Sequence, residues 1–393
     1  MSDLAKYLEE LNDTYLELHR TKEMSFWETR MGIKDRHEEL VESDLALREW
    51  LADPEPLAQL RRLKDQGDAT PEQMEVLNGW ILMFSRNQIE DAEARELQRE
   101  IAAQEGELQQ GRGKMKLGYT TPDGEFTPAS SVALGNAVRT SPDEAIRKAA
   151  FEGLRDIETY ALENGWVDIV KKRNRFARML GFEDFYDYKV QWAEGFDKKT
   201  LFGYLDELED RTRARAAEER ERLAAEHGDS ALKPWNFLFL SQGGSLQEEL
   251  DPYFSFEDAV ERWVRSFGAL GIRFRDAQLT LDLIDRKGKY ENGFMHGPGP
   301  AFVRHGEWLP AEINFTANAL PDQTGAGIRA AQTLFHEGGH AAHFANIVMG
   351  APCFSQEFAP TSVALAETQS MFCDAYLSDA DWRLRYGKNA AGE

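Results

Sequence analysis

Cysteine is scarce in this chain, with only Cys353 and Cys373 among 393 residues. A secreted scaffold held together by disulfides usually contains more cysteines than this. Both lie close in sequence to a histidine-rich segment, so one interpretation is that they bind a metal. Small thiols buried among apolar residues in a reducing compartment are much more common. We therefore expect both cysteines to be buried residues of the apolar core.

Long apolar runs are also missing. No stretch reaches the roughly 18 apolar residues that a membrane-spanning helix needs. The N-terminal segment MSDLAKYLEELND is charged from its third residue and has no apolar region of the kind found in signal peptides. These two absences lead us to expect a cytoplasmic protein with no membrane partner.

Positive charge is in deficit, with 46 Lys and Arg against 69 Asp and Glu, for a formal net charge of -23. Nucleic-acid binding requires a basic surface, so the sequence argues against a nucleic-acid partner. Anionic membranes are disfavoured for the same reason. We interpret the charge mainly as a source of solubility; the alternative is an acidic cleft that favours cationic peptides.

Proline is sparse, with 14 residues, and strong helix formers dominate, so the composition predicts a mainly α fold. Across residues 1–105, apolar positions recur at helical spacing. The segment Thr70-Pro71-Glu72-Gln73 is typical of a helix start, with Thr as N-cap, Pro at the first helical position and Gln at the third. Because no strict heptad is sustained, we expect an antiparallel helical lobe rather than a coiled coil.

Glycine, threonine and proline gather in residues 106–131, where the helical period fades. A short hairpin is predicted around Pro122-Asp123-Gly124. This stretch predicts a boundary between an N-terminal helical lobe, 1–115, and a second domain, 116–393.

The second domain is expected to begin with more helices. Ser141-Pro142-Asp143-Glu144 has capping residues like those at Thr70, and helices are predicted from there to about Glu226. Residues 227–251, with Pro234 and the Gly243-Gly244 pair, are interpreted as a connector. A further helix is predicted at roughly 256–270.

A small sheet is predicted after that helix. Leu279, Leu281 and Leu283 alternate with polar residues at strand spacing. Residues 293–300 are interpreted as a Gly/Pro loop. Short strands are then expected at 302–303 and 313–315.

The segment 327–350 is predicted to be a helix with three histidines on one face. His336, His340 and His343 step by four and three residues, opposite a face of small and apolar residues. His336-Glu337-Gly338-Gly339-His340 is an HExxH motif, whose spacing places two imidazoles beside one point where both can coordinate a Zn²⁺ ion. Glu337 would lie beside the metal and accept a proton from the attacking water.

The two glycines of the motif are costly within a helix, by about 1 kcal/mol each relative to Ala. We interpret Gly338 and Gly339 as sites of close packing against a neighbouring element. Such packing is compatible with function, since a packed rear face would hold the histidine face rigid.

A third protein ligand is required. The metzincin pattern would need His at position 346, where this chain has Asn346, so a later carboxylate is the main alternative. The candidates are Glu357, Glu367 and Asp374. We favour Glu367 because it lies in a well-formed predicted helix, with Ser370 and Asp374 following at helical spacing. His343 is interpreted as a residue that supports the site rather than as a ligand.

HEGGHAAH followed by ALAETQSMFCD resembles the thimet oligopeptidase and oligoendopeptidase F family of zinc peptidases. Gly339 and His343 match that family's motif, and its third ligand, a Glu on the next helix, falls on Glu367. Upstream segments carry the likeness from about residue 140 to the end, at residues 173–182, 234–236, 252–254 and 282–290.

The resemblance implies a mainly helical, two-lobed metallopeptidase fold with a small sheet beside the HExxH helix and a deep substrate channel. It implies one Zn²⁺ per chain, oligopeptide substrates and a peptidase domain over 116–393. The strand at 313–315 resembles the family's edge strand, along which the peptide is bound.

One family feature has no match. A His- and Tyr-containing segment that stabilises the oxyanion follows well after the third ligand in the family. Tyr376 and Tyr386 lie too near Glu367 to correspond to it. We therefore expect a missing C-terminal segment or a partner chain to supply those groups.

The leading hypothesis is a zinc metalloendopeptidase that acts on oligopeptides. A dipeptidyl carboxypeptidase on the same scaffold is one alternative. A non-catalytic zinc- and peptide-binding pseudoenzyme or fragment is the other. The presence of Glu337 favours catalysis, since a purely structural zinc site has no need of it.

Overall fold

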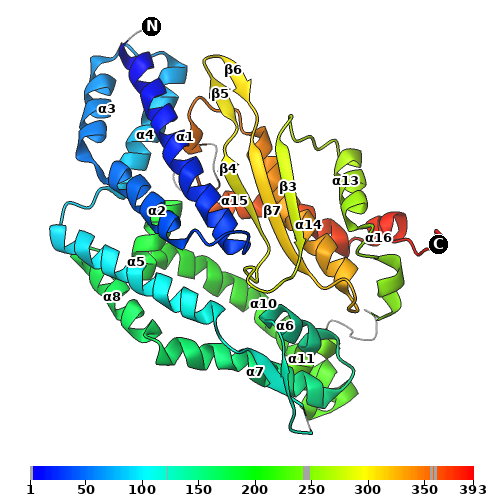
Figure 1. Cartoon of the computed structure of the whole chain (residues 1–393). Helices are drawn as coiled ribbons and strands as arrows, with labels where there is room; N and C mark the ends of the chain where they lie inside the picture. Colours follow the sequence, from blue (N-terminus) through cyan, green and yellow to red (C-terminus); the bar gives the residue numbers. More distant parts are fainter. Residues whose placement is uncertain (1–2, 122, 242–247, 355–356, 358–360) are drawn as a thin grey trace.

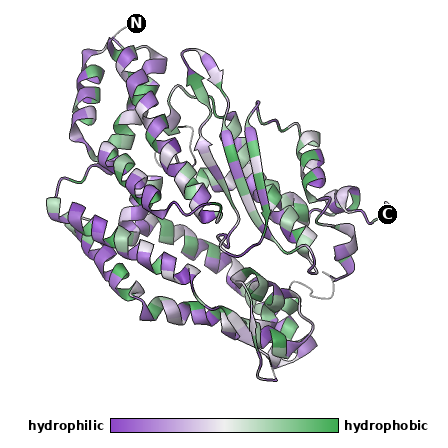
Figure 2. Ribbon diagram, viewed as in Figure 1, coloured by the Kyte–Doolittle hydropathy of each residue, from purple (hydrophilic) through white to green (hydrophobic). Residues whose placement is uncertain are grey.

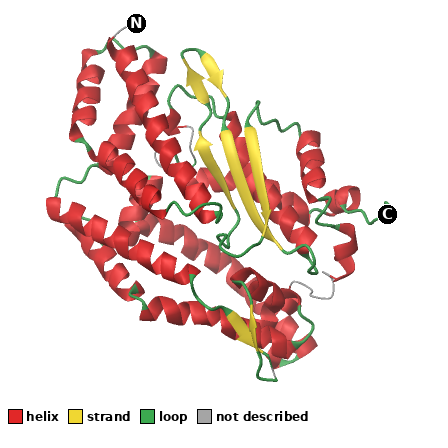
Figure 3. Cartoon of the chain, in the orientation of Figure 1, coloured by secondary structure: helices red, strands yellow, loops and turns green. Residues whose placement is uncertain are grey.

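The computed structural model describes residues 3–121, 123–241, 248–354, 357 and 361–393. It is mainly helical, as predicted, with a small sheet (Figures 1 and 3). The first helices are α1 (Asp3–Arg30), α2 (His37–Ala52), α3 (Pro54–Gln66), α4 (Pro71–Asn87) and α5 (Ala92–Gly113). Within the described residues, no helix combines the length and apolar content that crossing a membrane requires.

Helices α1 to α4 pack around one apolar core. Leu60, Leu77 and Trp80 are completely buried in it. The predicted start of α4 is confirmed, because Thr70 and Gln73 form a complete capping box. Figure 2 shows hydrophilic and hydrophobic residues interspersed along α1, as expected for a helix with one buried face.

The lower part of Figure 1 is a second group of helices, which α5 joins by packing against α7 and α8. Its elements are α6 (Ser131–Thr140), α7 (Glu144–Glu163), α8 (Trp166–Met179), α9 (Phe185–Glu194), α10 (Lys198–His227), a 3-10 turn at Asp229–Leu232 and α11 (Pro234–Ser241). The expected connector is thus partly helical, and its Gly243-Gly244 pair lies outside the described residues. The domain boundary at 115/116 stays a prediction.

The predicted hairpin is present. Strands β1 (Gly118–Thr120) and β2 (Phe126–Pro128) pair antiparallel. Gly124 lies in the turn with a φ of 86°, a conformation that favours glycine; Pro122 lies outside the described residues. Helix α7 begins two residues later than its expected cap suggested, because Asp143, not Ser141, accepts the backbone N–H of Ala145.

A three-stranded sheet lies beside the upper helices, in the order β3, β7, β4. Strand β3 (Gln278–Ile284) runs parallel to β7 (Glu312–Ala319), and β4 (Phe294–Gly299) runs antiparallel to it. Strands β5 (Phe302–Arg304) and β6 (Glu307–Leu309) form a separate hairpin. The strand at 313–315 is therefore central, and the prediction that it forms the edge was wrong.

The edge strand is β4, in the segment predicted to be a Gly/Pro loop. Its glycine and proline allow close packing at an edge. A Cβ on Gly297 would lie 2.3 Å from the ring of Phe344, so only glycine fits there. Pro298 lies where the register shifts between His296 and Gly299, a position that tolerates a residue without an N–H.

The sheet is covered by α14 (Ala326–Asn346), which is flanked by α13 (Ala259–Ala269) and α15 (Val363–Ala375). Aromatic rings fill the space between them, with Phe315 of β7 beside Trp263 and Phe267 beside Phe335. Helix α16 (Ala380–Tyr386) closes this core through Trp382, whose ring packs on Phe335. Short 3-10 turns at Asp251–Tyr253, Pro352–Phe354 and Tyr376–Ser378 connect these elements.

A buried polar cluster joins α1 to β4. Glu23 accepts a hydrogen bond from His296 at 3.0 Å, and His19 bonds the carbonyl of Gly297 at 3.0 Å. The His296 ring stacks on Trp27. Burial alone would raise the pKa of Glu23, but the bond from His296 and the charge of Lys22 outweigh it and hold the pKa well below its ordinary value. Burial lowers the pKa of His19.

This cluster makes stability depend on pH. The folded state holds Glu23 ionised and His19 neutral, whereas the unfolded chain binds protons at these groups below about pH 4.3 and pH 6.5. The stability from Glu23 is therefore complete above about pH 4.3 and that from His19 above about pH 6.5, and each is lost progressively as pH falls below its value. We expect Glu23→Gln to lower the free energy of unfolding at pH 7 by about 1–3 kcal/mol and to flatten its slope below pH 5.

Urea unfolding between about pH 2.5 and pH 7 measures both effects. The control is Glu10→Gln on the same helix, where the side chain is 60% exposed and the effect should stay within about 0.5 kcal/mol. An unchanged slope in Glu23→Gln would show that the cluster does not carry the pH dependence.

Candidate metal centre

The two glycines of α14 let the neighbouring helices pack in direct contact with it. A Cβ on Gly338 would lie 2.4 Å from Nε1 of Trp263 on α13. A Cβ on Gly339 would lie 2.8 Å from Cα of Ser370 on α15. The prediction of close packing is confirmed, and it brings the backbone of α15 against the HExxH segment.

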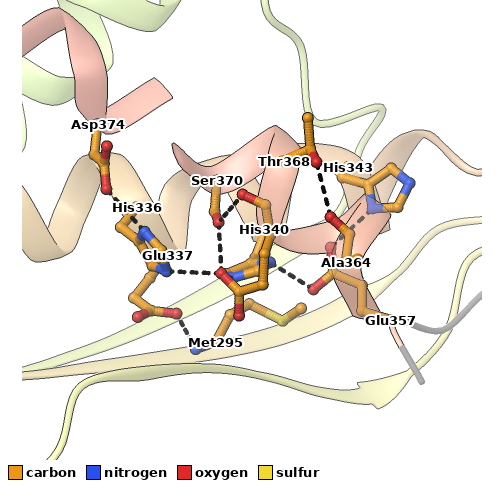
Figure 4. A network of polar contacts seen from close by, with 11 residues as sticks. Met295, His336, Glu337, His340, His343, Glu357, Ala364, Thr368, Ser370 and Asp374 are labelled. Atoms are coloured by element: carbon orange, nitrogen blue, oxygen red, sulfur yellow. Dashed lines mark hydrogen bonds and ion pairs between the residues drawn. The ribbon is translucent and has the colours of Figure 1, made fainter. Parts of the chain in front are cut away.

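This contact brings the two motif histidines and Glu367 together. Figure 4 shows His336 and His340 with Ser370 of α15 beside them. Nε2 of His336 lies 3.4 Å from Oε2 of Glu367, and Nε2 of His340 lies 3.5 Å from the same oxygen. One donor atom from each of the three residues falls within 4.8 Å of the others.

The other imidazole nitrogens face carboxylates. Nδ1 of His336 lies 3.0 Å from Asp374. Glu357 reaches two histidines, at 2.9 Å from Nδ1 of His340 and 2.8 Å from Nδ1 of His343. Nδ1 of His340 is close enough to Glu357 for an ion pair, but the two groups are not aligned for a hydrogen bond. These carboxylates fix the ring orientations and leave the Nε2 atoms directed at Glu367.

The carboxylate of Glu357 and the imidazoles of His340 and His343 stabilise one another's charged forms. Burial alone would lower the pKa of His340, but the Glu357 carboxylate outweighs it and the pKa is raised. Burial would likewise raise the pKa of Glu357, but His340 and His343 lower it overall. Of the three candidate carboxylates, Glu367 is therefore the one that approaches both Nε2 atoms, while Glu357 and Asp374 bind the opposite nitrogens.

Glu337 lies between α14 and the edge strand. Its side chain accepts a hydrogen bond from the backbone N–H of Met295 at 2.6 Å. Burial raises the pKa of Glu337, and the two neighbouring histidines only partly oppose this shift. The carboxylate is thus held next to the His336–His340 pair and against β4 at the same time.

Ser370 and the cysteines complete the surroundings. The Ser370 hydroxyl lies 3.0 Å from Oε2 of Glu367 and 3.0 Å from its backbone carbonyl, so it holds that carboxylate on α15. Cys353 and Cys373 are free, fully buried and located in two different apolar clusters. Burial raises the pKa of both thiols. The expectation that they are core residues is confirmed.

The residues present fit a zinc ion. Two imidazole nitrogens and one carboxylate oxygen, with a position left for water, form the usual donor set of a catalytic zinc site. The shared approach of both Nε2 atoms to one carboxylate oxygen agrees with a cation between them.

Sequence reasoning missed the paired role of Glu357 and the contact of Glu337 with Met295. Glu357 appeared only as a candidate ligand, because its distance from His340 along the chain gives no periodic signal. Met295 fell in the segment read as a loop. The spacing of His343 three residues after His340 is the one feature that could have suggested a shared carboxylate.

The packing at Gly339 leads to a prediction. Gly339→Ala should push α15 away, displace Glu367 and weaken zinc binding by about tenfold or more. Overpacking should cost about 1–3 kcal/mol, less the helix propensity gained from Ala. The control is Gly203→Ala on α10, where a Cβ meets nothing within 4 Å, so stability should rise by about 0.5–1 kcal/mol. Thermal unfolding and zinc titration of both variants test this prediction. Equal stability and equal zinc affinity in the two variants would contradict it.

Comparison with solved structures gives the same fold. An oligoendopeptidase F-type protein from Bacillus anthracis str. Ames aligns with a TM-score of 0.61 at 15% identity, over 96% of this chain and 68% of that one. PZ peptidase A, solved with an inhibitor, aligns with a TM-score of 0.60 at 16% identity, over 96% of this chain and 64% of that one. An M32 carboxypeptidase from Deinococcus radiodurans R1 aligns with a TM-score of 0.57 at 16% identity, over 97% of this chain and 64% of that one.

This chain thus spans about two thirds of the length of those structures. At such identities the likeness concerns the fold, and it confirms a helical metallopeptidase architecture. No curated protein matches the chain by sequence.

A sequence model provides the assignment. The model of peptidase family M3 matches residues 137–389, more than half of the chain. The matched segment includes β4, α14 and α15, the elements that bring Glu337, the two histidines and Glu367 together. The chain therefore belongs to peptidase family M3, a family of metallopeptidases.

Proposed function

We propose that this chain is a zinc metallopeptidase that hydrolyses oligopeptides, with His336, His340 and Glu367 as ligands of one Zn²⁺ ion and Glu337 as general base. The observation that carries the proposal is the approach of both Nε2 atoms to one Glu367 oxygen, directly beside a buried glutamate. Family membership and the peptidase names of the similar structures support it.

A zinc ion in this site would polarise the scissile carbonyl and make the attacking water more acidic. The Glu337 carboxylate accepts the proton of that water and then delivers it to the leaving amine. Its raised pKa suits both steps, since a general base works best when its pKa approaches the operating pH. The hydrogen bond from Met295 fixes the carboxylate while the proton moves.

The edge strand β4 is the surface on which we place the peptide. Met295 directs its N–H away from β7, toward Glu337, so this edge borders the catalytic residues. An extended peptide that adds to β4 as a further strand would be bound through its backbone, with little demand on side chains. This mode suits a peptidase of broad sequence tolerance.

The space near this edge is hollow. A large cavity, of about 1420 Å³, lies between the end of α1, the β1–β2 hairpin, α6 and the loop that leads into β4. It is not lined by the HExxH residues. It shares Ser131, Asn136 and Glu291 with a smaller cavity that reaches Thr333, one helical turn before Glu337. Together they would admit an extended peptide and exclude a folded protein.

The test is cleavage of a mixed pool of unstructured peptides, read by mass spectrometry, before and after treatment with a zinc chelator. We expect cleavage that stops on chelation and returns when Zn²⁺ is added. Cleavage that survives metal removal would contradict a zinc mechanism. Zinc binding without any cleavage would instead support a peptide-binding pseudoenzyme, or a requirement for groups from a further segment or a partner chain.

A further inference from the structure

The smaller cavity, of about 410 Å³, lies where the helical group that includes α6 meets the start of β4. Its wall combines Arg139 of α6, Arg329 and Thr333 of α14, Asn318 at the end of β7, and Gly293 just before β4. A Cβ on Gly293 would lie 2.7 Å from the Thr333 methyl group, so β4 enters the sheet in direct contact with α14. We call this cavity the arginine pocket.

The two arginines of the pocket have no carboxylate partner within the described part of the chain. The guanidinium of Arg139 bonds only the carbonyl of Gly135, at 3.2 Å, and that of Arg329 only the carbonyl of Thr324, at 3.4 Å. Burial lowers the pKa of Arg329 to about 10, and the positive charge of Arg139 adds to this effect. The negative charge of Asp251 partly opposes it. Arg329 therefore lies within electrostatic reach of a second positive charge, that of Arg139, in a protein whose net charge is -23.

The nearby acids are already engaged. Glu291, which also lines the pocket, accepts a hydrogen bond from Arg112 at 2.8 Å. Asp251 accepts the backbone N–H of Gly325 at 2.6 Å. Among the described residues, neither acid forms an ion pair with the two arginines, although Asp251 partly offsets the charge of Arg329.

Several buried polar atoms of the pocket have no partner in the described residues. Three of them can donate, namely Nη1 of Arg329, Nδ2 of Asn318 and Oγ of Ser131. Two acceptors, Oδ1 of Asn318 and Oδ1 of Asn136, are also unpaired. Buried polar groups are normally satisfied, so the wall of this pocket is a place where several polar groups lack protein partners.

The pocket is aligned with the catalytic base. Arg329, Thr333 and Glu337 recur every four residues, so they follow one face of α14, and Glu337 lies about 12 Å along the axis from Arg329. On β4, Gly293 lies two residues, or about 7 Å, before Met295. An extended peptide that starts at the catalytic centre reaches the pocket within two or three residues.

The geometry points to the arginine pocket as a subsite for a carboxylate group of the peptide substrate. This inference rests on the proposed peptidase function. A planar carboxylate matches the guanidinium groups and would relieve their mutual repulsion. Every free peptide carries one such group at its C-terminus, and an acidic side chain carries the same chemistry.

The position of the pocket sets the direction of the peptide. It lies at the N-terminal end of β4, so a peptide with its C-terminus there runs antiparallel to that strand. The scissile bond then lies two or three residues from the C-terminus. With the terminal carboxylate bound, the chain releases short C-terminal fragments, as a dipeptidyl carboxypeptidase does.

The experiment compares three peptides of otherwise identical sequence: a free acid, a C-terminal amide, and the amide with Asp as its last residue. We expect kcat/KM for the free acid to exceed that for the plain amide by about tenfold or more. Arg139→Gln and Arg329→Gln should abolish the difference, and Arg139→Lys should keep part of it. Equal use of the Asp amide and the free acid would identify an acidic side chain as a second source of the carboxylate.

Binding of fluorescent versions of the peptides to the Glu337→Gln protein provides a readout that does not depend on turnover. Arg265→Gln is the matched control, because it removes an exposed arginine of α13 that lines neither cavity. Equal binding and cleavage of acid and amide would overturn the inference and leave the proposed function intact. An equal loss of preference in Arg265→Gln would also overturn it, since the overall charge of the protein would then explain the effect. Binding preference without cleavage of any peptide would support the pocket and contradict the proposed function.

Discussion

Replacing Glu337 with Gln is expected to lower kcat for peptide hydrolysis by about 10²–10⁴-fold and to leave zinc content and folding unchanged. Gln keeps the size of the side chain and can still accept the Met295 N–H, but it cannot take a proton from water. The Glu337 side chain is buried, so the loss should not be offset by bulk solvent acting as base.

Steady-state kinetics on a fluorogenic peptide, with zinc content measured in parallel, check this expectation. Glu307→Gln, an exposed position on β6, serves as the control and should retain full activity. A Glu337→Gln protein that retains both its zinc and its activity would remove Glu337 from the mechanism.

The second large effect is expected from the ligands themselves. His340→Ala or Glu367→Ala should reduce zinc affinity by several orders of magnitude and activity to background, because each removes one of three converging donors. Asp374→Asn and Glu357→Gln should cost only about 10–100-fold, since those carboxylates orient the histidines from the opposite nitrogens.

Competition with a chromophoric chelator measures these affinities on one scale. His305→Ala, on the exposed turn between β5 and β6, is the control and should bind zinc like the unaltered protein. If the Glu357 variant lost zinc as completely as the Glu367 variant, the assignment of the third ligand would have to change.

Much of the fold around the site could be predicted from local pattern. The helix that carries His336 and His340 follows from spacing alone, because a period of three and four residues belongs to no other regular structure. The capping box at Thr70 and the hairpin between β1 and β2 follow from short-range chemistry. Such features need no knowledge of what lies across the molecule.

The edge strand could not be predicted in this way. The glycine and proline content of β4 indicates a loop when only the sequence is considered. Gly297 is required by the ring of Phe344, which lies 47 positions later, and Pro298 is tolerated because of a register shift against β7. The resemblance of residues 313–315 to the family's edge strand predicts an edge there, whereas β3 and β4 flank β7 on both sides.

The supporting carboxylates show the same limit. Glu367 could be favoured as a ligand from its helical context, but whether Glu357 or Asp374 reaches Nε2 or Nδ1 depends on how α15 packs on α14. That packing is determined by Gly339 against Ser370 and is invisible to periodicity. The arginine pocket was also not predicted, since Arg139 and Arg329 are 190 residues apart and meet only in the folded chain.

The measurement that tests the central claim most directly is X-ray absorption spectroscopy at the zinc edge, on protein reconstituted with one equivalent of Zn²⁺. We predict a first shell of nitrogen and oxygen at about 2.0–2.2 Å with imidazole scattering from two histidines. In His340→Ala, the imidazole signal should fall or the zinc should be lost. Sulfur scattering at about 2.3 Å, or a spectrum unchanged by His340→Ala, would contradict the site described for this chain.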